Sequence, residues 1–232
     1  MRKFIILLYL LSFGVILIPI GLATLILTYP FDRKLVVMNL FSRVYAGLLV
    51  YGCHNTVFRI EGKENIEKGK TYIIISNHRS FFDIPQLQLL PINLRWVSKR
   101  EVLQIPLLGW VLAMQGSITV KRGDKDSARS MMKKGKKLLQ KGVSIVIFPE
   151  GTRSKTGRVG HFRAGGFLLA KSAGVDILPT MLYNSKEGIE GKIGKRVRLT
   201  LKILPPVDIN SCSVKEMAKN FEETYIKGTS KN

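Results

Sequence analysis

A histidine and an aspartate stand five residues apart, directly after an apolar stretch of the chain. His78 and Asp83 follow residues 71–76, where three consecutive isoleucines predict a buried β-strand. In an open α/β sheet, chemistry collects at the carboxyl ends of the strands. A histidine at such a place can act as a general base, and a nearby carboxylate can orient its imidazole ring.

Asp83 also has structural interpretations. Residues 81–90 predict a short helix, and Asp83 can be its N-cap, with Pro85 in the first turn. Ser80 and Asp83 can alternatively pair as in a capping box. Both roles are compatible with an aspartate that also orients His78.

Charged residues follow three further predicted strands. Lys99 follows a strand over residues 94–98, and Arg122 follows one over residues 116–120. A β-branched strand over residues 143–148 leads into Glu150, Gly151 and Arg153. Such turns can converge on one crevice of an α/β sheet, although a glycine there can also serve a tight turn alone. Fixed cations of this kind suit a phosphate, which arginine can bind through two hydrogen bonds.

Several other chemistries lack their sequence signals. No G-x-S-x-G elbow occurs, and the two cysteines form neither a zinc pattern nor a disulfide framework. We therefore expect no metal and no cofactor. Direct transfer remains the economical scheme, in which His78 takes a proton from an incoming hydroxyl group. The residues alone leave Ser76 and Ser80 open as covalent acyl carriers.

Predicted strands and helices alternate along most of the chain. Further strands are expected over residues 56–61, 176–183 and 196–204, and helices over 106–114, 125–141, 163–173 and 214–226. This order predicts an α/β fold with a mixed, largely parallel sheet flanked by helices. We assign residues 53–232 to this one domain, because no linker interrupts it.

The N-terminal residues 1–52 predict membrane-anchoring helices. Residues 4–28 contain no charged side chain, and a bilayer-spanning helix needs about 20 apolar residues. The run is too long for the apolar region of a signal peptide. Residues 34–51 have amphipathic spacing, so the two segments could instead lie in one leaflet, or the second could be an ordinary core-facing helix. In each membrane mode we expect the body on the cytoplasmic face of the cell (inner) membrane.

The formal net charge of +21 indicates an anionic partner. A membrane surface, nucleic acid and a phosphate-bearing substrate all fit that charge. The lysine-rich helix over residues 125–141 is either a solvated face or a lipid-contacting one.

Six segments resemble the motifs of glycerophospholipid acyltransferases, which carry an H-x4-D signature. In chain order they are residues 77–83, 97–110, 116–122, 148–154, 162–165 and 175–179. The first reads Asn-His-Arg-Ser-Phe-Phe-Asp and the fourth Phe-Pro-Glu-Gly-Thr-Arg-Ser. The likeness covers about residues 55–205, in family order and spacing, and is closest to bacterial members that acylate 1-acyl-glycerol-3-phosphate. Thr119 departs from it, because the family often has an aromatic residue there.

The resemblance implies an enzyme. It would transfer an acyl group from acyl-CoA or acyl-carrier protein to the sn-2 hydroxyl of 1-acyl-glycerol-3-phosphate (lysophosphatidic acid), giving phosphatidic acid. It implies His78 and Asp83 as catalytic residues. It assigns the phosphorylated acceptor to Arg122, Glu150, Gly151 and Arg153, with Lys99 as a helper.

Two alternatives stay open. The acceptor could be glycerol-3-phosphate or another lysophospholipid. The chain could also be a non-catalytic, basic membrane-bound module for anionic lipid or nucleic acid. We expect lysophosphatidic acid, the acyl donor and membrane lipids as partners, and no nucleic acid.

Overall fold

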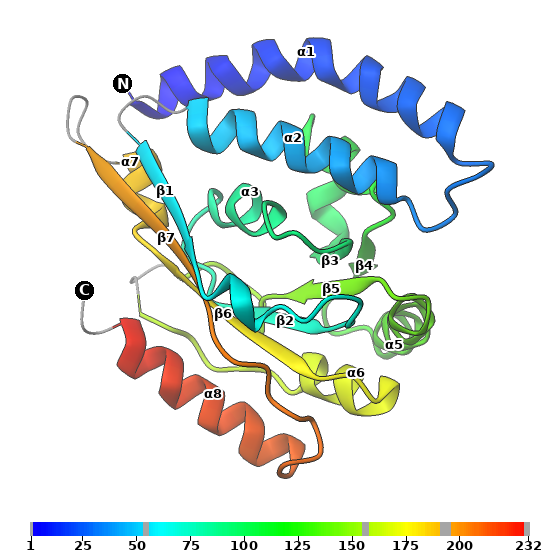
Figure 1. The fold of residues 1–232 in the computed structure, drawn as a ribbon, viewed down its shortest axis with the longest axis vertical. Helices are drawn as coiled ribbons and strands as arrows, with labels where there is room; N and C mark the ends of the chain where they lie inside the picture. Colours follow the sequence, from blue (N-terminus) through cyan, green and yellow to red (C-terminus); the bar gives the residue numbers. More distant parts are fainter. Residues whose placement is uncertain (1, 53–55, 155–157, 191–195, 230–232) are drawn as a thin grey trace.

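A seven-stranded sheet forms the centre of the protein (Figure 1). The computed structural model describes residues 2–52, 56–154, 158–190 and 196–229, without the side chains of residues 2–13, 189 and 190. The strands are β1 (Thr56–Glu61), β2 (Ile73–Ser76), β3 (Leu94–Lys99), β4 (Ile118–Val120), β5 (Ser144–Ile147), β6 (Ile177–Tyr183) and β7 (Val197–Ile203). Their spatial order is β1-β7-β6-β2-β5-β3-β4. Only the β6–β7 pair is antiparallel among these neighbours, so the predicted mixed, largely parallel sheet is confirmed.

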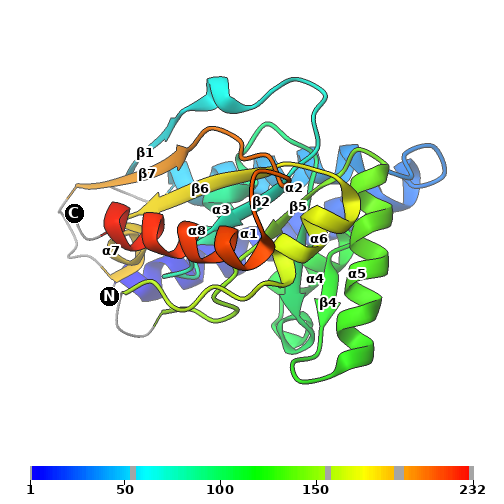
Figure 2. The ribbon, with the colours of Figure 1, turned by 90° about the horizontal axis from the view of Figure 1, so that it is seen from below.

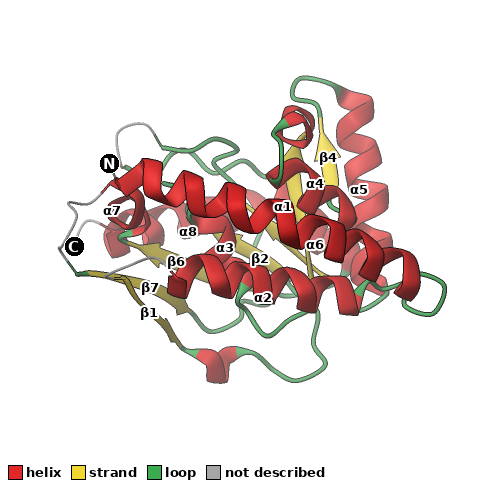
Figure 3. Cartoon of the chain, turned by 90° about the horizontal axis from the view of Figure 1, so that it is seen from above, coloured by secondary structure: helices red, strands yellow, loops and turns green. Residues whose placement is uncertain are grey.

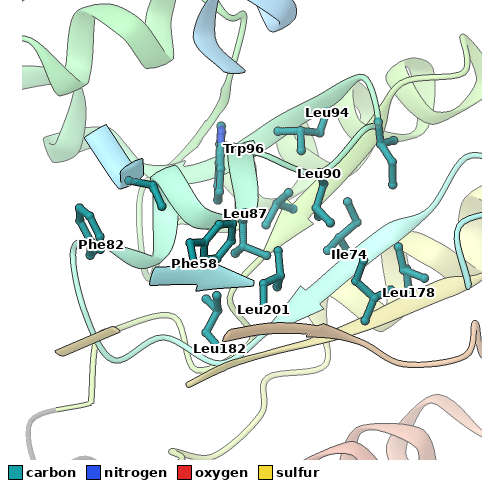
Figure 4. Close-up of a cluster of buried hydrophobic side chains, with 14 of the residues drawn as sticks. Phe58, Ile74, Phe82, Leu87, Leu90, Leu94, Trp96, Leu178, Leu182 and Leu201 are labelled. Atoms are coloured by element: carbon teal, nitrogen blue, oxygen red, sulfur yellow. The ribbon is translucent and has the colours of Figure 1, made fainter. Parts of the chain in front are cut away.

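The central strands are apolar on both faces because helices cover both faces. Successive side chains of a strand point to opposite sides. In β2, Ile74 therefore joins one core with Trp96 and Leu201, which Figure 4 shows in close-up. Ile73 and Ile75 join a second core on the other side of the sheet. The continuous apolar run in the sequence is typical of such a doubly covered, parallel strand.

Two groups of helices form the outer layers. The first core packs against α2 (Val36–Gly52), α3 (Asp83–Gln88) and α4 (Leu108–Met114). The second packs against α5 (Lys125–Gln140), α6 (Gly165–Ala173) and α8 (Val214–Thr229), seen from below in Figure 2. The short helix α7 (Ser185–Glu190) and the 3₁₀ turns η1 (Lys63–Asn65) and η2 (Arg100–Gln104) were not expected from the sequence.

Helix α1 (Arg2–Thr28) lies beside α2 on the outer side of the molecule (Figure 3). Close approach is possible at Gly21, where a Cβ atom would lie 2.7 Å from the ring of Phe41. Helix α2 is in turn held to β3, because the Asn39 side-chain amide donates to the carbonyl of Leu94 at 3.1 Å. The core-facing interpretation of residues 34–51 is thus correct for one side of α2.

The outer side of this helix pair is apolar and exposed. Exposed apolar side chains on α1 and α2 are Val15, Ile16, Ile20, Leu22, Ile26, Leu27, Val36, Val37, Leu40, Val44, Leu48 and Tyr51. Within the described residues, no helix has both the length and the apolar character needed to cross a membrane. The prediction of a spanning helix over residues 4–28 therefore gains no support. The predicted boundary between residues 52 and 53 falls at 53–55, which are outside the described residues.

Candidate active site

The imidazole of His78 is hydrogen-bonded to the carboxylate of Asp83. His78 Nδ1 lies 2.8 Å from Asp83 Oδ2, and Asp83 is fully buried. The same oxygen accepts the backbone N–H groups of Arg79 and Ser80, both at 2.7 Å. Because Oδ2 acts as an acceptor, it places the proton of the neutral imidazole on Nδ1 and leaves Nε2 able to accept one.

The structural interpretation of Asp83 is resolved by the same contacts. Asp83 begins α3 rather than preceding it, so it is not the N-cap. Its bond from the Ser80 N–H is the reciprocal half of a capping box, and the Ser80 hydroxyl accepts the N–H of Phe82 at 3.2 Å. Because Phe82 and not Ser80 is the N-cap of α3, these contacts are like those of a capping box but close the turn before the helix, and Asp83 serves the turn and the histidine together.

The backbone around His78 is fixed by side chains from distant elements. Asn77 is fully buried, and its amide exchanges two hydrogen bonds with the backbone of Leu182 in β6, at 2.9 and 2.8 Å. The hydroxyl of Tyr225, from α8, donates to the carbonyl of Ile75 at 2.7 Å and accepts the N–H of Thr180 at 3.0 Å. Burial raises the pKa of this hydroxyl, so it stays protonated as the donor. The end of β2 is thus held in place before His78.

Glu150 occupies a different place from the one expected. Glu150 is 7% exposed, and its carboxylate oxygens accept the backbone N–H groups of His78 at 2.8 Å and Gly160 at 2.9 Å. Burial raises the pKa of this carboxyl, against the lowering effect of the two backbone donors. Glu150 does not line the pocket beside His78. The geometry therefore joins Glu150 to the turn that carries His78, and not to the surface of the pocket.

A pocket of about 770 Å³ opens beside His78. Lys99, Gly151 and Arg153 line it, as the sequence predicted, together with Arg79 and Lys186, which were not predicted. The rest of its wall combines a larger apolar set with four hydroxyl-bearing residues. The apolar residues are Phe81, Ile84, Trp96, Val97, Val102, Leu112 and Phe148, and the hydroxyl-bearing residues are Ser80, Ser98, Thr152 and Ser154. The pocket thus joins a histidine, several cations and an apolar wall.

Arg122 lies beside this pocket rather than in its wall. A Cβ atom on Gly151 would lie 3.2 Å from Arg122 Nη2 and 3.4 Å from Arg163 Nε, so the missing side chain leaves room for both guanidinium groups. Gly151 also has φ +68°, a conformation that favours glycine. Burial, together with the charge of Arg163, lowers the pKa of Arg122, while Glu101 raises it.

The aromatic support of the site was missed in the sequence. The rings of Phe148 and His78 are stacked, and Trp96 lies against Phe148. Asn77 was noticed only as part of a motif. Asn77 and Phe148 share one signal, because each directly follows the last residue of a buried strand, β2 and β5, whereas Trp96 lies inside β3.

The two serines next to His78 differ in their access to the pocket, because Ser80 lines it and Ser76 does not. Ser76 is fully buried, and the Ser80 hydroxyl is bonded to the Phe82 backbone. Within the described chain, neither hydroxyl is hydrogen-bonded to His78. Among the same residues, no group of three or more His, Cys, Asp and Glu side chains could hold a metal ion.

The fold and the site together define an α/β protein with an oriented histidine at a strand end, facing a cationic and partly apolar pocket. Comparison with known proteins agrees with that class. The Acyltransferase family model matches residues 57–183. The Helicobacter pylori 1-acyl-sn-glycerol-3-phosphate acyltransferase is 30% identical over 224 residues, 91% of this chain and 90% of that protein.

Two further similar proteins match this chain over different fractions of their own length. The chloroplast 1-acyl-sn-glycerol-3-phosphate acyltransferase LPAT1 of Arabidopsis thaliana is 36% identical over 175 residues, 75% of this chain. The aligned part is 48% of that protein, so the chain matches about half of its length. The crystal structure of the 1-acyl-sn-glycerophosphate (LPA) acyltransferase PlsC from Thermotoga maritima is similar over 100% of this chain and 97% of that one. Its TM-score is 0.76 and its sequence identity 26%.

The chain therefore belongs to the acyltransferase family that includes the 1-acyl-sn-glycerol-3-phosphate acyltransferases.

Proposed function

We propose that this protein transfers a fatty acyl group from an acyl thioester to the sn-2 hydroxyl of 1-acyl-glycerol-3-phosphate, giving phosphatidic acid. The observation that carries the proposal is the His78–Asp83 hydrogen bond of 2.8 Å at the wall of a pocket that is both cationic and apolar. A lysophospholipid needs both characters, because it joins a phosphate to an acyl chain. The named relatives are 1-acyl-sn-glycerol-3-phosphate acyltransferases, which supports the same acceptor.

The reaction proceeds by direct transfer. Nε2 of His78 takes the proton of the acceptor hydroxyl while its oxygen attacks the thioester carbonyl carbon. The carbon–sulfur bond then breaks, and the leaving thiolate takes the proton back from the imidazolium. Asp83 holds the imidazole in the productive tautomer and stabilises its charged form. No acyl-enzyme is needed, which agrees with the lack of a hydrogen bond from His78 to the hydroxyl of Ser76 or Ser80 within the described residues.

The acceptor phosphate binds at the cationic part of the pocket. Lys99, the last residue of β3, and Arg153, in the loop after β5, line this part, and Gly151 lies next to Arg122. When the phosphate is bound there, the hydroxyl of the same acceptor molecule is held at a defined position relative to His78. The acyl chains lie along the apolar wall that includes Trp96.

The acceptor itself is tested by a panel of lysophosphatidic acid, glycerol-3-phosphate and other lysophospholipids at equal concentration. Free thiol released from acyl-CoA gives the rate for each. We expect the highest kcat/KM with lysophosphatidic acid. A clear preference for soluble glycerol-3-phosphate, or for a lysophospholipid with a substituted phosphate, would contradict the proposed acceptor.

We further propose that α1 and α2 anchor the protein to the surface of the cell (inner) membrane, with the pocket on the cytoplasmic side. The motivating observation is the row of exposed apolar side chains on both helices, among which Leu40 and Val44 lie one turn apart on α2. The substitutions Leu40→Glu and Val44→Glu should reduce co-sedimentation with anionic vesicles. Gln140→Glu in α5, across the sheet, is the matched charge control. Equal binding by all three proteins would contradict the anchor.

The acyl donor is acyl-CoA or acyl-carrier protein. Exposed lysines of α5, including Lys133, Lys134, Lys136 and Lys137, offer a basic surface to an acidic carrier protein. Reversing their charge should raise KM for acyl-carrier protein and leave KM for acyl-CoA unchanged. Unchanged KM values for both donors would show that α5 does not take part in donor binding.

A further inference from the structure

An aromatic ring covers one face of the His78 imidazole. The ring centroids of His78 and Phe148 lie 3.9 Å apart, and the two planes are inclined by only 11°. Phe148 lies in turn against Trp96, with centroids 6.0 Å apart and planes inclined by 29°. All three residues line the same pocket. Phe148 belongs to the motif over residues 148–154, but no role for its side chain follows from the sequence.

We propose that Phe148 is a positioning residue for the general base: its ring holds the His78 imidazole in a fixed plane and stabilises the imidazolium that forms during acyl transfer. This inference rests on the proposed function, because the imidazolium forms only if His78 takes a proton.

The hydrogen bond to Asp83 cannot hold the imidazole alone. It acts in the plane of the ring, at Nδ1, and leaves the ring able to tilt about the line that joins the two atoms. A ring stacked on the face of the imidazole restricts that tilt. Asp83 and Phe148 together therefore fix the direction of Nε2, the nitrogen that must meet the acceptor hydroxyl.

The stacked ring also interacts with the charge that develops on His78. The face of an aromatic ring carries negative charge density, which attracts a cation placed over it. The attraction is present in the charged form and largely absent in the neutral one, so it favours the state in which the base holds the proton. Arg79, Lys99 and Arg153 line the same pocket and oppose a further positive charge. Stacking on Phe148 acts with Asp83 to offset that repulsion.

The ring of Phe148 has its own supports. Trp96 is 3% exposed, and its Nε1 donates to the side-chain oxygen of Gln88 at 3.0 Å, which fixes the indole against which Phe148 lies. The Phe148 carbonyl accepts the N–H of Gly151 at 3.0 Å, so the turn after the ring is closed as well. The imidazole is thus stacked on a side chain that is itself held in place.

Substitutions at Phe148 separate the aromatic face from apolar bulk. Phe148→Leu keeps an apolar side chain and removes the ring face, whereas Phe148→Tyr keeps the face. We expect Phe148→Leu to lower kcat by about 3- to 30-fold, the range that a cation–ring attraction supports, with KM for donor and acceptor within about twofold. Phe148→Tyr should stay within about threefold of the wild type. Phe58→Leu, in the same core but on β1, is the control for lost aromatic packing.

Three kinetic results would overturn the proposal. They are a normal kcat for Phe148→Leu, an equal loss for Phe148→Tyr and Phe148→Leu, and a change confined to KM for the acyl donor. The last result would make Phe148 only a wall of the acyl-chain site. A wild type that releases no thiol with any lysophospholipid would contradict the proposed function instead.

A spectroscopic measurement tests the stacking without any turnover. Protons of a stacked imidazole are shielded by the ring current of its neighbour. We expect the His78 ring protons, assigned by their loss in His78→Ala, to resonate upfield of those of exposed His161. Phe148→Tyr should keep this shift and Phe148→Leu should abolish it. Unshifted His78 protons in the wild type, or a shift that survives Phe148→Leu, would contradict the stacking.

Discussion

The backbone N–H of His78 donates to the Glu150 carboxylate at 2.8 Å. The second oxygen of the same carboxylate accepts from Gly160 at 2.9 Å, so one buried side chain joins the turn with the histidine to the loop that follows Arg153. The carbonyl of His78 accepts the N–H of Ser154 at 2.9 Å and closes the connection from the other side. Glu150 therefore connects two parts of the site that the sequence places far apart.

Kinetics can separate this role from substrate binding. Glu150→Ala leaves two backbone donors unpaired and frees the His78 turn, and displacement of a catalytic group by about 1 Å can cost about 100-fold in rate. We expect kcat to fall by about 10- to 100-fold, with KM for lysophosphatidic acid within about threefold. Glu216→Ala, at an exposed position of α8, is the control. A rise in acceptor KM larger than the fall in kcat would restore Glu150 as a substrate ligand.

The buried Glu150 carboxyl also makes stability depend on pH. Its pKa is raised from the ordinary 4.5 because burial disfavours the charged form. Above the ordinary value the folded state holds this proton more tightly than the unfolded chain, so its contribution to stability is lost as pH rises through the raised pKa. The glutamine side chain of Glu150→Gln does not titrate, so the stability of this variant lacks the pH-dependent contribution of residue 150.

Unfolding in urea from pH 4.5 to pH 7 measures this difference. The free energy of unfolding of the wild type should fall relative to that of Glu150→Gln as pH rises. Titration of the other groups is common to both proteins and cancels in the comparison. A gap that stays constant, or that changes in the opposite direction, would show that burial does not raise the pKa of Glu150.

The two hydrogen bonds of Asn77 should be costly to remove. Asn77→Ala leaves the buried N–H and C=O of Leu182 without partners, and each unsatisfied buried group costs about 1–3 kcal/mol. We therefore expect a loss of about 2–6 kcal/mol in the free energy of unfolding. Asn65→Ala is the matched control, because the partly buried Asn65 donates one hydrogen bond to Ile203. Equal losses for the two variants would disprove a special role for Asn77 at the end of β2.

Lys99 and Arg153 should act on the acceptor. A hydrogen bond to a charged group contributes about 1.5–3 kcal/mol, which corresponds to roughly 10- to 100-fold in affinity. Lys99→Ala and Arg153→Ala should each raise KM for lysophosphatidic acid within that range and leave KM for acyl-CoA unchanged. Lys202→Ala, exposed on β7, controls for a lost surface charge. A rise in KM for acyl-CoA alone would show that these cations bind the acyl donor and not the acceptor.

The local signals of the sequence predicted the sheet well. The isoleucines of β2 and the β-branched run of β5 are long enough to specify buried strands, and the carboxyl ends of these strands bring His78 and Gly151 to one pocket. Helix α7 and the η turns escaped prediction because they are short and lack a periodic pattern. The paired α1 and α2 helices could not be placed by hydropathy alone, since one side of α2 faces the core.

The roles of single polar residues were harder to infer. The family resemblance implies Glu150 as a ligand of the acceptor, and only the fold shows that its carboxylate turns inward to backbone N–H groups. The pairing of Asn77 with Leu182 joins residues 105 positions apart, which no local pattern encodes. Phe148 was interpreted as the last residue of an apolar strand, and its stacking on His78 depends on two strand ends meeting in space.

The most direct test of the proposed mechanism is the rate of free-thiol release from acyl-CoA and lysophosphatidic acid by His78→Ala. Loss of a general base costs about 10²–10⁴-fold, so we predict a fall of that size with the folded structure retained. His161→Ala is the matched control, because the exposed His161 pairs with Glu222 outside the pocket. It should keep near-normal turnover. Near-normal turnover by His78→Ala would contradict His78 as the base of a direct acyl transfer.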